Sequence, residues 1–127
     1  MSSEELHVPR EALSQEARLL HYGIVSLKEE LDAADWYRQR ADDTEDETLR
    51  EILLHNMREE MEHAAMLLEW LRRHNEDFAG HLRTYLFTEM PIVGIERAVE
   101  ASQSAAPAAP PPARGGVITI GSLKGMR

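Results

Sequence analysis

Glu60 and His63 lie three residues apart within the segment HNMREEMEHAAMLLEWLRR, residues 55–73. Side chains at this spacing share one face of an α-helix, so both can reach a single metal ion. Glu60 also shares its helix face with Leu53 and Leu67, which predicts that this face points toward the protein core. An ionised carboxylate is too costly to bury alone, so a cation or a hydrogen-bonding partner must compensate it. The pair therefore predicts a metal site.

A second carboxylate, Glu30, follows Leu27 by three residues and precedes Ala34 by four, so it faces inward on an earlier helix. With a turn near Thr44, Glu30 lies about 14 positions before the turn and Glu60 about 16 after it. The two carboxylates should therefore meet at one level of an antiparallel hairpin.

One glutamate from one helix and a Glu-x-x-His from its neighbour make half of a di-iron carboxylate set, which needs two copies of each. The sequence offers one such copy. A hairpin of two long helices also leaves one flank of its apolar stripe uncovered, which favours pairing with a second hairpin. We therefore predict that a second copy of the chain supplies the other half of the site across a two-fold interface.

The composition sets the class of protein. The chain has 127 residues, of which 43% are hydrophobic and 29% charged, which indicates one domain of a soluble protein. Its apolar residues are mostly Leu, Ala, Met and Ile, which favour an all-α fold. No cysteine is present, so metal ligands must be His, Asp or Glu, which suits iron or manganese. The net charge of −9 disfavours nucleic acid. The absence of a signal-peptide pattern and of a span-length apolar run predicts a cytoplasmic protein without a membrane partner.

Four helices are predicted to position these residues. Apolar steps of three and four residues predict a helix from Leu13 to about Ala41. The capping-box pattern of Thr44 and Glu47 predicts the start of a second, which should run to about His74. Shorter helices are predicted for residues 76–87, after an N-cap at Asn75, and for residues 92–101, after Pro91.

The chain divides by composition into four segments. We expect a flexible N-terminus over residues 1–8, a helical domain over 9–100, an Ala/Pro/Gly-rich linker over 101–116 and a small apolar segment over 117–127. The predicted fold is all-α: an antiparallel two-helix hairpin plus one or two short C-terminal helices, with two chains pairing into a ferritin-like four-helix bundle.

Several segments together resemble one family. EELDAADWYRQR (residues 29–40), HNMREEMEHAAMLLEWLRR, HLRTYLFTEMPI and the terminal IGSLKG are similar to encapsulated ferritins of the encapsulin nanocompartment systems. The similarity spans most of residues 20–95 plus the tail. It implies a ferroxidase that oxidises Fe(II) to Fe(III) with dioxygen at a di-iron centre between two subunits. It also implies a ring-shaped homodecamer, and iron stored as mineral inside an encapsulin shell in the cytoplasm.

The resemblance also implies roles for single residues. Glu30, Glu60 and His63 match the di-iron ligands, and Tyr37 would lie near the centre. Glu29, Asp32 and Trp36 would line the path by which iron reaches it, with Asp32 standing where a glutamate is expected. Calcium, manganese or zinc could occupy the same positions. The tail resembles the peptide that docks such proteins onto the shell, with the apolar anchors Ile118, Ile120 and Leu123.

Two other classes of protein are also compatible with the sequence. One is a different di-metal enzyme, such as a manganese catalase. The other is a non-enzymatic helical adaptor recruited by its C-terminal tail, with the inner carboxylates as hydrogen-bonded structural groups. Trp36 and Tyr37 are explained equally well by packing at a subunit interface, and acidic residues such as Glu59 and Glu62 usually belong to a solvated face.

Overall fold

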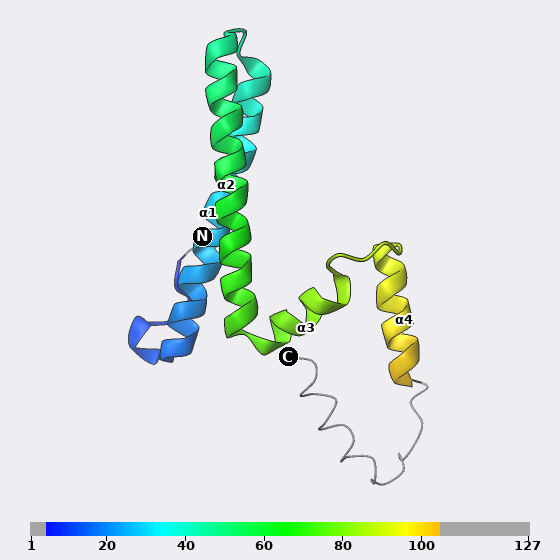
Figure 1. The fold of residues 1–127 in the computed structure, drawn as a ribbon. Coiled ribbons are helices and arrows are strands. Elements are labelled where there is room, and N and C mark those ends of the chain that lie inside the picture. Colours follow the sequence, from blue (N-terminus) through cyan, green and yellow to red (C-terminus); the bar gives the residue numbers. More distant parts are fainter. Residues whose placement is uncertain (1–4, 105–127) are drawn as a thin grey trace, which may run out of the picture. The chain divides into compact units, whose positions relative to one another are not determined.

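The computed structural model describes residues 5–104. The predicted shell-docking tail, with Ile118, Ile120 and Leu123, lies outside the described residues, as do most of the predicted linker and residues 1–4. Within residues 5–104 every regular element is a helix: η1, α1, α2, α3 and α4 in chain order (Figure 1). This confirms the all-α prediction. The chain separates into two compact units, one ending at Leu86 and one beginning at Phe87, and each is described by itself.

Two long helices form the first unit. After the short 3₁₀ helix η1 (Arg10–Ala12), α1 (Gln15–Asp43) and α2 (Glu47–His74) run side by side as the predicted hairpin (Figure 1). Ser14 caps α1, since its side chain accepts a hydrogen bond from the Ala17 N–H, so α1 starts two residues later than predicted. Residues 10–12, before the predicted start, form η1.

The turn between the helices differs in detail from the capping-box prediction. Asp46, not Thr44, is the N-cap of α2, and its Oδ1 accepts from the Leu49 N–H at 2.9 Å. Thr44 instead ends α1 and accepts from the Asp46 N–H through Oγ1. Arg50 fastens the turn by donating to the carbonyl oxygens of Ala41, at 2.9 Å, and Thr44. These contacts fix the register of the two helices at the tip of the hairpin.

Small residues on α1 allow the helices to approach closely. Gly23, Ala34 and Ala41 are buried on α1. A Cβ at Gly23 would lie 2.7 Å from the Trp70 ring, so only glycine permits the observed spacing there. The α2 side of this core consists of Leu53, Ala64 and Leu71.

One hairpin leaves much of its apolar surface exposed. Several large apolar side chains on both helices are 42–56% exposed, namely Leu19, Tyr22, Ile24, Leu31, Trp36, Leu49, Ile52, Met61 and Met66. Burial of apolar surface is the main stabilising term in folding and association. The hairpin therefore offers a large area for contact with another chain, as the sequence predicts.

The short helix α3 (Glu76–Tyr85) follows α2 directly and contacts it. Asn75 is its N-cap, as predicted, with Oδ1 accepting from the Phe78 N–H at 2.8 Å. The helix ends at Tyr85, two residues before the predicted end.

The second unit begins at Phe87, whose positive φ of 62° is unusual for a bulky residue. Its described part contains α4 (Ile92–Ser104), which starts immediately after Pro91 as predicted and runs three residues past the predicted end. Among the described residues, no helix is long and apolar enough to cross a bilayer.

Candidate metal centre

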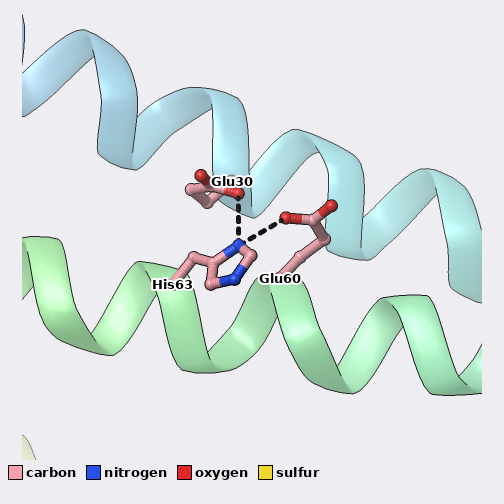
Figure 2. A group of neighbouring side chains, drawn as sticks. All are labelled: Glu30, Glu60 and His63. Atoms are coloured by element: carbon pink, nitrogen blue, oxygen red, sulfur yellow. Dashed lines mark hydrogen bonds and ion pairs between the residues drawn. The ribbon is translucent and has the colours of Figure 1, made fainter.

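Glu30, Glu60 and His63 converge in the groove between α1 and α2. Glu30 comes from α1, and the other two come from adjacent turns of α2 (Figure 2). His63 Nδ1 lies 3.1 Å from Glu60 Oε1 and 3.5 Å from Glu30 Oε1. One ligand atom from each residue lies within 4.8 Å of the others. The structure thus brings together the three residues that the sequence singled out.

The cluster lies at the edge of the core. The side chains of Glu30, Glu60 and His63 are 26%, 21% and 42% exposed. The sequence pattern predicted a carboxylate facing the core, whereas the structure leaves the groove partly open to solvent. The difference follows from the hairpin having only two helices, so that nothing in the first unit covers this side of the groove.

The three side chains of the cluster shift one another's pKa. A hydrogen bond between the carboxyl groups of Glu30 and Glu60 raises the pKa of Glu30 and lowers that of Glu60, and desolvation raises the pKa of Glu30 further. The hydrogen bond to Glu60, together with the charges of both carboxylates, raises the pKa of His63. The site is therefore electronegative enough to retain protons that a neutral groove would release, and a divalent cation would compete for the same place.

The donor set fits a hard or borderline cation. Two carboxylates and one imidazole suit iron, manganese or zinc. They supply fewer ligands than the four glutamates and two histidines of a complete di-iron set. Among residues 5–104, this is the one group of three acidic or histidine side chains close enough together to share an ion. Three protein residues can therefore hold one cation, and a pair of cations needs a second donor set.

The other predicted site residues lie outside this group. Tyr37 follows Glu30 by seven residues, two helical turns, and therefore points to the same side of α1. It is half-buried, and the Arg40 guanidinium lies 5.6 Å from the centre of its ring. Glu29, Asp32 and Trp36 are exposed on α1, and the structure does not bring them into the cluster. Within residues 5–104, no fourth acidic or histidine side chain joins the group of Glu30, Glu60 and His63.

Several known proteins are similar to this chain over most of its length. A family model described as EncFtn-like matches residues 5–89. An "Encapsulated ferritin-like protein" of Rhodospirillum rubrum is 51% identical over 98% of this chain and 91% of its own length. A "Ferritin-like protein" of Thermotoga maritima is 52% identical over 74% of this chain and 82% of its own length.

A solved structure supports the fold. The crystal structure of a Nitrosomonas europaea protein matches with a TM-score of 0.67 and 50% identity, over 68% of this chain and 96% of that one. The family model covers two-thirds of the chain, including all three residues of the cluster. The chain therefore belongs to the EncFtn-like family, the encapsulated ferritins.

Proposed function

We propose that the chain is a ferroxidase that oxidises Fe(II) to Fe(III) with dioxygen at a di-iron centre shared between two subunits. The observation that carries this proposal is the convergence of Glu30, Glu60 and His63, with ligand atoms within 4.8 Å of one another. This set is half of the di-iron carboxylate arrangement. Membership of a ferritin-like family supports iron as the metal.

A second copy of the chain completes the centre in this proposal. Each copy contributes two carboxylates and one imidazole, so two copies supply the full set of four glutamates and two histidines. Two further observations support pairing: the groove that holds the cluster is partly open, and large apolar side chains on both helices are exposed. A two-fold axis through the cluster would bury both features at once.

Fe(II) is the substrate of this reaction. Carboxylates are hard anionic donors that suit both Fe(II) and Fe(III). His63 of each copy would bind the iron on its own side of the interface. Each of two irons gives up one electron, and dioxygen accepts both to form peroxide with two protons. The protons that the cluster holds must leave before iron binds, because iron requires ionised carboxylates and a neutral imidazole.

The remaining assignments are part of the same proposal. Tyr37 would act beside the centre, and the exposed side chains of Glu29, Asp32 and Trp36 would line the path of incoming iron. Their placement on α1 next to Glu30 is compatible with this role. Calcium, manganese and zinc are further candidates for these positions.

The similarity to an encapsulated ferritin-like protein of Rhodospirillum rubrum supports association with an encapsulin shell. We propose that the segment around Ile118, Ile120 and Leu123 docks onto that shell in the cytoplasm, and that the part of the predicted linker that follows α4, residues 105–116, serves as its tether. Paired hairpins would assemble into a ring-shaped decamer, and the shell would hold the mineral.

Stopped-flow oxidation of Fe(II), combined with native mass spectrometry with and without metal, tests the proposal. The chain should oxidise iron, and Glu60→Ala and His63→Ala should abolish rapid oxidation and metal-dependent pairing. His55→Ala is the matched control, because His55 lies on the same helix outside the cluster. Oxygen release from peroxide without iron oxidation would instead indicate a catalase. An oligomeric state that changes neither with metal nor with the Glu60→Ala and His63→Ala substitutions would indicate an adaptor.

A further inference from the structure

The apolar side of α4 forms a groove that the proposed metal centre does not use. Its volume is ≈ 370 Å³, and it is lined by Met90, Ile95, Ala98, Val99, Ser102 and Gln103. Ile95 is buried, whereas Met90 and Val99 are 57% and 37% exposed. Most of the lining side chains are apolar, so this α4 groove suits an apolar occupant.

The helix itself needs such an occupant. α4 has 13 residues, and isolated helices of this length are only marginally stable in water. Most of the stability of such a helix comes from packing its apolar face. Among residues 87–104, the described part of its unit, α4 is the one helix, so no second helix of this part covers the groove. Another part of the chain, or another chain, would supply the missing contact.

The chain that follows α4 carries a matching segment. Residues 105–116 are almost all Ala, Pro or Gly, and large apolar residues return in residues 117–123, VITIGSL. α4 exposes Glu96 and Glu100 on the flank next to Val99. From residue 105 to its end, the chain has three basic residues and no acidic one, namely Arg114, Lys124 and Arg127. The tail therefore matches the α4 groove in both polarity and charge.

We infer that residues 117–123 dock into the α4 groove of the same chain. An extended segment of this length spans about 23 Å, and α4 is about 20 Å long. The connecting residues 105–116 reach at most about 40 Å. The segment can therefore fold back along α4 in either direction. A short flexible connection gives an effective concentration in the mM range, so a weak contact is sufficient to hold the segment.

A second copy of α4 is the poorer occupant of the groove. Its exposed Glu96 and Glu100 would approach the same residues of the first copy, and like charges repel. The tail brings the opposite charge and is covalently attached to the helix that it covers.

Docking in the groove keeps the apolar segment out of water until another partner takes it. The proposed shell contact uses Ile118 and Ile120 of the same segment, so α4 and the shell compete for it. This competition rests on the proposed docking to a shell, whereas the contact with α4 does not.

Disulfide formation within the chain tests the contact, because the natural chain contains no cysteine. Ala98 lines the groove near the middle of α4, and Ser122 lies on the same side of an extended segment as Ile120. The full-length Ala98→Cys/Ser122→Cys chain is equilibrated in glutathione redox buffers, which gives the effective concentration of one thiol at the other. The matched control is Arg97→Cys/Ser122→Cys, because Arg97 is exposed on the side of α4 opposite Ile95.

A tail without a docking site would close both disulfides equally well, because the two loops differ by one residue in length. With the segment in the groove, the effective concentration in the Ala98→Cys/Ser122→Cys chain should exceed that of the control on the order of tenfold. A ratio close to one would overturn the inference. A linked dimer on a denaturing gel, in place of a linkage within one chain, would overturn it as well.

Two substitutions in the Ala98→Cys/Ser122→Cys chain test the apolar contact. Ile120→Ser should lower the effective concentration to the level of the control, because burial of one isoleucine changes an equilibrium by about tenfold or more. Thr119→Ser, on the other side of an extended segment, should leave it unchanged. Equal effects of the two substitutions would contradict the inference. Fe(II) oxidation by the natural chain is measured separately, and the groove shares no residue with the metal cluster, so either proposal can fail while the other stands.

Discussion

Replacing Gly23 with alanine tests the close packing that holds the hairpin at its Trp70 end. The new Cβ would lie 2.7 Å from the nearest carbon of the Trp70 ring and 3.3 Å from Leu71 Cδ2. Leu71 is 1% exposed and cannot move aside easily. The Trp70 ring would have to shift and would lose its stacking on His74.

Two effects of opposite sign decide the stability of Gly23→Ala. Alanine favours the helix over glycine by about 1 kcal/mol. Overpacking a close contact costs about 1–3 kcal/mol. The expected result is a loss of roughly 0–2 kcal/mol in the free energy of unfolding.

Gly80→Ala isolates the packing term. A Cβ at Gly80, within α3, would meet no atom within 4 Å, so this variant should gain about 0.5–1 kcal/mol from helix propensity alone. Urea unfolding of both variants at one protein concentration gives the difference, since assembly changes apparent stability. The free energy of unfolding of the Gly80→Ala chain should exceed that of the Gly23→Ala chain by about 1–3 kcal/mol. Equal gains for both would refute the reasoning from the close contact.

Three further predictions follow from single contacts. Metal binding should weaken as the pH falls, because Glu30 and His63 must lose protons to bind a cation and the pKa of each is raised. Mn(II) titrations across the neutral range should show this, with a flatter dependence in His63→Ala. Asp46→Ala should cost about 1 kcal/mol in thermal unfolding by removing the α2 cap, with Glu45→Ala as the neutral neighbour. Hydrogen bonds from Arg72 and Arg73 lower the pKa of Glu69 to about 2, yet its side chain is 42% exposed. Glu69→Gln should therefore lower the free energy of unfolding in urea only slightly, and by less at high salt, whereas a loss that does not change with salt would contradict this.

Apolar periodicity and the Glu-x-x-His spacing were enough to predict the hairpin and the cluster. Glu30 and Glu60 could be matched across the turn because both helices rise by the same distance per residue. Two residues at equal numbers of positions from the turn therefore lie side by side in the hairpin. The end of α2 and the cap at Asn75 were also predicted correctly, since both depend on local sequence.

Other features depend on contacts that a pattern does not contain. Thr44 fits the capping-box pattern, but Asp46 caps α2, and the Thr44 carbonyl accepts a hydrogen bond from Arg50 in the turn. The exposure of Glu60 could not be predicted either, because a core-facing stripe becomes buried only when something covers it. The same holds for the close contact between Gly23 and the Trp70 ring, which depends on how closely the two helices approach each other.

The central claim is that one di-iron centre is built from two copies of this chain. A crystal soaked in Fe(II), with the iron located by anomalous scattering, tests it most directly. We predict two iron sites about 3.5–4 Å apart across a two-fold axis. Each should be bound by His63 of one copy and by carboxylates of Glu30 and Glu60 from both. Iron held by a single chain away from any two-fold axis, or absent from Glu60 and His63, would contradict the account.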